Sequence, residues 1–246
     1  MTTPDFQCES GFKPPRRWKI LLLTHNILVV NCWFMLLGCA VGQTQRQEII
    51  HHVDEAENLR ESNLSGYSVT ERYEVYRNGE NAAAAEMVVE TVYKRGGGKQ
   101  YKVVSKGSGF IQKHVLDRIL AEEEQISKGD LRQSVLVTSA NYDMEPEREE
   151  VISGRRCLVL KLEAKRSSPY LLNGHLWVDA QSYHVVRIDG KTSAMPSIWA
   201  GHPVVRRDSK ELGGFAVAVA SRSVAKNILL GQTVVTIEYQ NYRLEP

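Results

Sequence analysis

The stretch that decides the fold is Val151–Gly190, VISGRRCLVLKLEAKRSSPYLLNGHLWVDAQSYHVVRIDG. Within it, Cys157–Glu163 alternates leucines with more polar residues, which is typical of a strand with one apolar face. Two further strand candidates, His175–Asp179 and Tyr183–Asp189, are separated by a gap of hairpin length. We therefore expect three strands whose shared apolar face consists of Leu158, Leu160, Leu162, Leu176, Val178, Val186 and Ile188.

Alternation of the same kind precedes this stretch. Tyr67–Arg77 and Ala82–Arg95 flank Asn78-Gly79, a strong hairpin signal, and Lys99–Ser105 follows a run of three glycines. Tyr142–Glu150 is polar and is expected to be a loop or an edge strand. The apolar face of the first of these strands consists of Tyr67, Val69, Tyr73 and Val75.

Three closing strands are expected after the central stretch, at Val204–Asp208, Gly213–Ser223 and Gln232–Leu244. Their apolar faces include Phe215, Val217, Val235 and Ile237. The segment Thr192–Pro203 between them is apolar but interrupted by proline and glycine, and a flap is one interpretation of it.

Two helices are expected. Gln43–Asn63 and Ile111–Lys128 both repeat apolar residues at spacings of three and four. The apolar stripe of the second helix consists of Ile111, Val115, Ile119 and Leu120, and Glu122–Glu124 is interpreted as a solvated acidic run.

About ten strands and two helices, arranged in runs, indicate an α+β fold that is mostly antiparallel β. Two helices do not easily cover the apolar face of so long a sheet. The sheet is therefore expected either to roll closed or to keep a groove, and larger rolled sheets enclose cavities.

Residues 1–42 have the pattern of an export signal. A basic segment, Pro14–Lys19, precedes the apolar run Ile20–Val41, and Ala40-Val41-Gly42 fits a signal-peptidase site. The run is also long enough to remain as a membrane anchor. A third alternative is a lipoprotein, because Leu36-Leu37-Gly38-Cys39 resembles a lipobox in which Cys39 is lipidated. Each alternative places a domain of residues 43–246 outside the cytoplasm.

Composition narrows the classes of function. The chain is 42% hydrophobic and 24% charged, which is normal for a globular protein. Outside the first 42 residues, basic and acidic residues are equal in number, which argues against nucleic acid as a partner. Three of the four cysteines lie in the leader, so neither a disulfide framework nor a cysteine zinc site is expected. Cys157 is interpreted as an inert residue on the face opposite the leucines.

The sequence motifs for catalysis and for cofactor binding lack residues that they require. Gly107 and Gly109 match the start of a dinucleotide fingerprint, but Gln112 stands where the third glycine belongs. The histidines lack metal-ligand spacing, and we expect no cofactor and no metal. Trp177 and Trp199 are open to two interpretations, as ordinary core or as the lining of a ligand cavity.

The layout resembles a known family. The pieces that carry the likeness are Gly154–Leu162 (GRRCLVLKL), Gly174–Asp179 (GHLWVD), Val185–Gly190 (VVRIDG) and the closing Gly231–Tyr242. Together with the leader and the two helices, they are similar to the LolA/LolB-type outer-membrane lipoprotein-sorting superfamily, which includes RseB-like periplasmic sensors.

The resemblance implies a strongly curved half-barrel sheet with two covering helices and an apolar lumen, preceded by the signal or anchor segment. The apolar faces named above would then hold a lipid or a lipidated protein, with Ile111, Val115 and Ile119 on the lid. The implied role is a periplasmic carrier without catalysis, touching the membrane through its N-terminal segment if that is retained. Two alternatives remain open: a sensor that binds an envelope protein partner, and a hydrolase whose site forms only in space.

Overall fold

The computed structural model describes residues 43–196, 201–227 and 231–246. The chain divides into two compact units, Met1–Gln45 and Arg46–Pro246. Residues 1–42, which include the expected signal sequence and Cys39, lie outside the described residues, as do residues 197–200 with Trp199.

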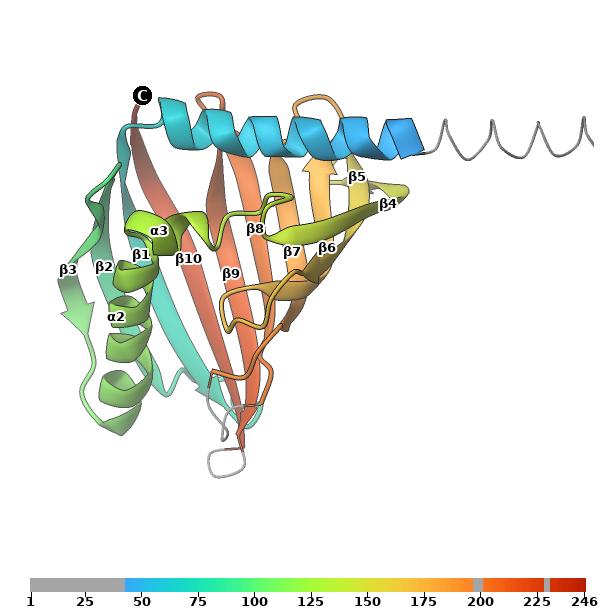
Figure 1. Ribbon diagram of the computed structural model, residues 1–246. Coiled ribbons are helices and arrows are strands. Elements are labelled where there is room, and N and C mark those ends of the chain that lie inside the picture. The colour runs from blue at the N-terminus through green and yellow to red at the C-terminus, as the bar shows by residue number, and fades with distance from the viewer. Residues whose placement is uncertain (1–42, 197–200, 228–230) are drawn as a thin grey trace, which may run out of the picture. The chain divides into compact units, whose positions relative to one another are not determined.

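A single sheet of ten strands forms the body of this unit (Figure 1). The order across the sheet is β3-β2-β1-β10-β9-β8-β7-β6-β5-β4, and every neighbouring pair is antiparallel. The strands are β1 (Gly66–Arg77), β2 (Ala85–Lys94), β3 (Gly98–Lys106), β4 (Tyr142–Ile152), β5 (Arg155–Ala164), β6 (Leu172–Asp179), β7 (Val185–Thr192), β8 (Val204–Leu212), β9 (Phe215–Asn227) and β10 (Gly231–Glu245).

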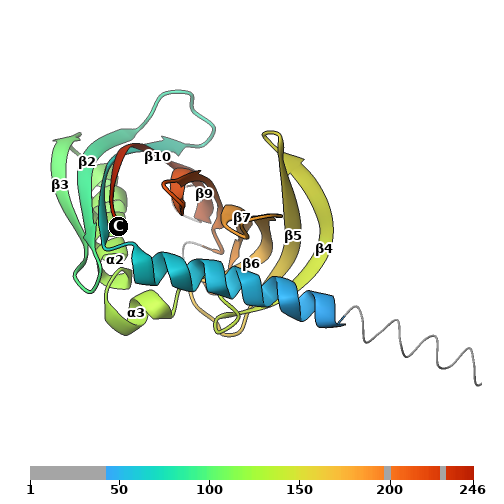
Figure 2. The same cartoon turned by 90° about the horizontal axis from the view of Figure 1, so that it is seen from above.

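The sheet is strongly curved, and its two edges are β3 and β4 (Figure 2). All other consecutive strands are hydrogen-bonded neighbours, and the last strand pairs with the first. The connection between the two edge strands holds a π-helical turn η1 (Gln112–Leu116), helix α2 (Asp117–Ile126) and the short helix α3 (Gly129–Gln133). We call the face that carries these helices the inner face.

The expected fold class is confirmed, because the chain forms one curved, open, antiparallel sheet with few helices. The polar segment Tyr142–Glu150 is an edge strand rather than a loop. The expected helix Ile111–Lys128 is present as η1 and α2, although Gly129-Asp130 starts the short α3 instead of leading into a loop.

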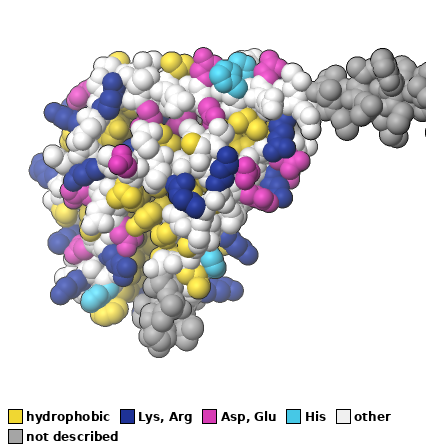
Figure 3. Space-filling model, in the orientation of Figure 1, with side chains coloured by type: hydrophobic (Ala, Val, Ile, Leu, Met, Phe, Trp, Pro, Cys, Tyr) yellow, Lys and Arg dark blue, Asp and Glu magenta, His cyan; other side chains and the backbone are white. Residues whose placement is uncertain are grey.

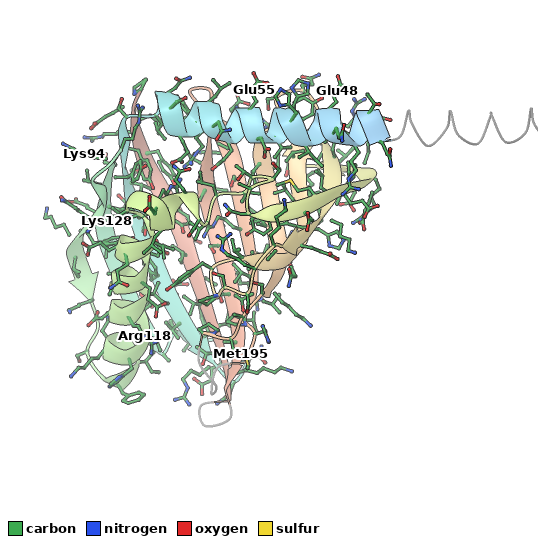
Figure 4. All side chains as sticks on the ribbon, viewed as in Figure 1. Glu48, Glu55, Lys94, Arg118, Lys128 and Met195 are labelled. Atoms are coloured by element: carbon green, nitrogen blue, oxygen red, sulfur yellow. The ribbon has the colours of Figure 1, made fainter. Side chains whose placement is uncertain are left out.

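The N-terminal helix, residues 43–63, runs from near β4 to the start of β1 (Figure 2). Its apolar residues Ile49, Ile50 and Val53 pack on the inner face of the sheet. The acidic side chains of Glu48 and Glu55 point away from the sheet (Figure 4). This division is what the three- and four-residue spacing predicts for an amphipathic surface helix.

Polar contacts fix this helix at several points. Arg46 Nε donates a hydrogen bond to the carbonyl of Met144 on β4 at 3.1 Å, and Arg60 Nε donates one to the carbonyl of Ala216 on β9 at 3.1 Å. Asp54 accepts hydrogen bonds from both the amide and the hydroxyl of Ser139, at 2.7 and 2.5 Å. The helix therefore connects strands that lie far apart in the sheet.

Two apolar clusters fill much of the inner face. One lies where the N-terminal helix covers the β4–β7 side, and the other lies where η1 and α2 cover β1, β2 and β10. Buried members of the first cluster are Val53, Tyr142, Met144, Leu160, Leu162, Leu171, Leu172, Leu176, Val178 and Ile188. Buried members of the second are Tyr73, Val75, Met87, Val89, Leu116, Leu120 and Ile237.

A third cluster lies on the opposite, outer face and contains Cys157, Val159, Trp177 and Val186. Cys157 is thus on the face opposite the leucines, as expected. The expectation that Val186 shares a face with Ile188 is wrong. A register shift between Trp177 and Val178 marks a β-bulge that leaves Val186 unpaired, and a bulge changes the phase of alternation.

Trp177 therefore does not line an inner cavity. Its indole Nε1 donates a hydrogen bond to Oε2 of Glu150 at 2.8 Å, and the guanidinium of Arg187 lies 5.8 Å from the centre of its ring. Of the two interpretations of this tryptophan, the structure supports core packing on the outer face.

Candidate functional site

A cavity of about 270 Å³ lies on the inner face, between the two inner apolar clusters. It is bordered by the end of α2, by α3 and the segment after it, by the connection between β5 and β6, and by strands β3, β4, β6, β7 and β8. Its lining consists of Lys99, Glu123, Ile126, Ser127, Arg132, Val135, Val137, Tyr142, Pro169, Tyr170, Leu172, Ile188, Thr192, Val205 and Arg207. Apolar surface is visible on this side of the molecule among basic and acidic side chains (Figure 3).

One wall of the cavity is apolar. Leu172, Ile188 and Val205 reach it from three consecutive strands, β6, β7 and β8, because antiparallel neighbours in register present side chains on the same face. Val137 and Tyr142 add to this wall from the segment after α3 and from β4. A hydrocarbon placed here loses contact with water on one side.

The opposite wall is charged. Lys99 on β3 donates a hydrogen bond from Nζ to Oε2 of Glu123 on α2 at 2.5 Å, and the phenol of Tyr101 donates to the same oxygen at 3.1 Å. Burial tends to raise the pKa of Glu123, but the charge and hydrogen bond of Lys99 prevail and lower it. Glu123 is therefore held as a carboxylate.

A second carboxyl group lies deeper beneath this pair. Glu71 and Tyr73 on β1 are both fully buried, and the Tyr73 phenol donates to Oε2 of Glu71 at 2.5 Å. Oε1 of Glu71 is 3.9 Å from Lys99 Nζ and accepts no hydrogen bond from any described residue. Burial raises the pKa of Glu71, and the nearby Lys99 offsets this only in part.

Arg132 on α3 contributes a second paired cation. Its guanidinium donates to both carboxylate oxygens of Glu61 on the N-terminal helix, at 2.5 and 3.2 Å. Burial opposes ionisation of Glu61, yet Arg132 and Arg60 lower the pKa of its carboxyl group. This two-point contact joins the N-terminal helix to α3.

Arg207 on β8 is the third cation of the lining, and it differs from the other two. Its side chain is solvent-accessible, and it has no hydrogen bond or ion pair with any residue in the described part of the chain. It faces Ile188 directly across the β7–β8 ladder. An unpaired positive charge therefore stands beside the apolar wall.

Most residues expected to line a lumen are packed instead as core. Leu158, Leu160, Leu162, Leu176 and Val178 belong to the first inner cluster, and Tyr73, Val75, Val235 and Ile237 belong to the second. Among the described residues that were expected to line a lumen, Ile188 is the only one that lines this cavity. The expected lid residues Ile111, Val115 and Ile119 pack against the second cluster.

The remaining candidates lie apart from these groups. Tyr67 stacks on Tyr93 with ring centres 5.1 Å apart, and Val69 is buried. Phe215 and Val217 belong to none of the three clusters formed by the described residues. Val186 lies on the outer face, as given above.

The sequence contains signals for the charged wall that alternation of apolar residues alone does not reveal. Glu71 falls at the two-residue spacing between Val69 and Tyr73 on an otherwise apolar face. Glu123 continues the four-residue spacing of the inward stripe of its helix, so the acidic run Glu122–Glu124 is not uniformly solvated. A charge on an apolar face is unusual enough to mark a site.

Within the described ranges, no group of three or more His, Cys, Asp or Glu residues is placed to hold a metal ion. In those ranges there is also no helix of the length and apolarity that crossing a bilayer requires.

No protein-family model matches the chain, and no curated protein matches it. Among solved structures, the chain is similar to a LolA superfamily protein from Nitrosomonas europaea, with 12% identity and a TM-score of 0.42 over 82% of this chain and 94% of that one. It is also similar to a domain described as an outer membrane lipoprotein-sorting protein from Vibrio parahaemolyticus, with 11% identity and a TM-score of 0.44 over 78% and 91%.

A third similar structure is the MucA/MucB complex of Pseudomonas aeruginosa, with 13% identity and a TM-score of 0.27 over 81% of this chain and 98% of that one. The structural similarities thus include the superfamily that the sequence layout resembles. At such low identities and TM-scores they assign no function to this chain.

Proposed function

We propose that this protein binds the acyl chain of a lipid or of a lipidated protein in the cavity on the inner face of its sheet. The observation that supports this is the apolar wall formed by Leu172, Ile188 and Val205, which lines the cavity at the border of the first inner cluster. Each methylene group that leaves water for such a wall contributes about 0.8 kcal/mol to binding.

The size of the cavity sets a limit on the occupant. Ligand-binding cavities commonly measure about 300–1,000 Å³. At about 270 Å³, this cavity has room for only part of a long acyl chain. A full chain requires displacement of covering segments.

The proposed role is that of a carrier or chaperone at the cell envelope, without catalysis and without a cofactor. Export rests on the signal pattern of residues 1–42, and membrane contact would come from that segment if it is retained. Cys39 would be lipidated if its lipobox is used. A domain of residues 43–246 would then act at the periplasmic face.

A matched pair of tryptophan substitutions tests the proposal. Val205 lines the cavity, whereas its neighbour Val204 points to the other face of β8 and is 38% exposed. We expect Val205→Trp in the full chain to fill the cavity and abolish binding of radiolabelled palmityl alcohol, and Val204→Trp to bind as the wild type does. Equal binding by all three proteins, or binding by none, would refute the proposed function.

A further inference from the structure

We infer that the ligand is an amphiphile with one acidic group, and that Arg207 binds this group while the acyl chain lies along the apolar wall. This inference rests on the proposed function and adds the chemical class of the ligand's polar end. The shared chemistry is an oxyanion attached to a hydrocarbon chain, as in a fatty acid or a phosphatidic acid.

The pairing of charges in the cavity wall carries the argument. Lys99 is joined to Glu123 at 2.5 Å, and Arg132 is joined to Glu61 at 2.5 Å. Arg207 has no ion-pair partner among the described residues. The two paired cations are therefore neutralised within the protein, and the wall keeps one positive charge available for a ligand.

The position of Arg207 gives the ligand a direction. Arg207 and Val205 share the inner face of β8, two residues apart, and Arg207 is the register partner of Ile188 on β7. Val205 in turn faces Gly190, and Leu172 continues the wall on β6. A chain whose acidic end meets Arg207 can thus lie across β8, β7 and β6 on apolar side chains.

The charges around Arg207 favour a ligand with one acidic group over a ligand with several. The guanidinium of Arg207 offers a planar pair of donors that matches a carboxylate or phosphate oxygen pair. Burial by itself would lower the pKa of Arg207, but Tyr239 and the ionised carboxylate of Glu123 on the charged wall prevail over burial and raise it. A further negative charge on the ligand would be repelled by Glu123.

Two neighbouring arginines provide the test. Arg207→Gln removes the unpaired cation, whereas Arg206→Gln removes an arginine on the opposite face, whose Nε lies 3.6 Å from Oδ2 of Asp208. Binding of palmitate, palmityl alcohol and dipalmitoyl phosphatidic acid to the full chain is measured by native mass spectrometry and by competition. A hydrogen bond to a charged group contributes about 1.5–3 kcal/mol, so we expect Arg207→Gln to weaken binding of the acidic ligand at least about tenfold.

Binding of palmityl alcohol should be the same in the wild type, Arg207→Gln and Arg206→Gln. Dependence on Arg207 with palmitate identifies a fatty acid as the source of the acidic group, and dependence with phosphatidic acid alone identifies a phospholipid. Equal effects of the two arginine substitutions, or equal affinity for acid and alcohol, would overturn the inference and leave the proposed function standing. Failure of all three probes to bind would overturn both.

Discussion

Lys99 on the edge strand β3 and Glu123 on α2 form a hydrogen-bonded ion pair, with Nζ and Oε2 2.5 Å apart. Each side chain is only 19% exposed. The pair joins an edge of the sheet to the helix that covers it, and it forms part of the cavity wall. Because the pair is partly buried, we expect it to contribute more to stability than an exposed ion pair and less than a fully buried one.

We predict that Lys99→Met lowers the free energy of unfolding by about 2–3 kcal/mol, because it leaves the carboxylate of Glu123 without its cation in a site with little water. The value is below the 3–5 kcal/mol that is typical of fully buried pairs. Lys102→Met on the same strand is the control, since Lys102 is 78% exposed and its pair with Glu90 contributes about 0–1 kcal/mol. Urea unfolding of both variants measures the difference, and equal losses would contradict the prediction.

Glu71 makes stability depend on pH in a predictable direction. Its pKa is raised in the folded protein, chiefly by burial, so the folded protein binds the proton more tightly than the unfolded chain does. The contribution of Glu71 to stability therefore falls as the pH rises from about 4.3, the ordinary glutamate value, to the raised value. We expect Glu71→Gln to gain stability relative to the wild type across that interval, by at most about 1.4 kcal/mol per pH unit.

Glu123→Gln serves as the control, because its stability relative to the wild type should change with pH in the opposite direction. The pKa of Glu123 is lowered by Lys99 despite burial, so its carboxylate stabilises the fold above the ordinary glutamate pKa, and this stability is lost as the pH falls through the lowered value. The variant should therefore lose stability relative to the wild type as the pH rises from acid to neutral. Thermal unfolding of both variants at a series of pH values is the measurement, and slopes of the same sign would rule out these two assignments.

Alternation in the sequence predicted the strands well because a half-buried sheet imposes a period of two on every strand. Even the edge strand β4 was one of the two alternatives for its segment. Val186 was misplaced because a β-bulge adds one residue without changing the local composition. Only the pairing register reveals that the faces exchange there.

The candidate site was less predictable than the fold. Lys99, Glu123 and Arg207 come from three segments that are far apart in the sequence, and no spacing rule connects them. Their meeting depends on the curvature of the sheet and on the path of the connection between β3 and β4. The cavity occupies only part of the inner face, because residues of the covering helices such as Val53, Leu116 and Leu120 pack with strand residues over the rest.

Cys157 should be unreactive in the native protein. It is fully buried on the outer face, and burial raises the pKa of its thiol, so little thiolate is present at neutral pH. We expect iodoacetamide to modify Cys157 slowly in the folded full chain and rapidly in urea, as measured by peptide mass spectrometry. Rapid labelling without denaturant would show that the third cluster opens readily.

Gly174 on β6 and Gly190 on β7 are direct partners in the ladder, and neither leaves room for a side chain. A Cβ atom added at Gly174 would lie 2.1 Å from the carbonyl oxygen of Asp189 and 2.5 Å from Cα of Gly190. Both contacts are with backbone, so the strands themselves must separate to admit a methyl group.

We predict that Gly174→Ala lowers the free energy of unfolding by about 1–3 kcal/mol or more. Gly97→Ala in the turn before β3 is the control, because its nearest atoms are 3.7 Å away and the change should stay within about 0.5 kcal/mol. Urea unfolding compares the two, and a Gly174→Ala protein as stable as the control would mean that β6 and β7 are less closely apposed than this register requires.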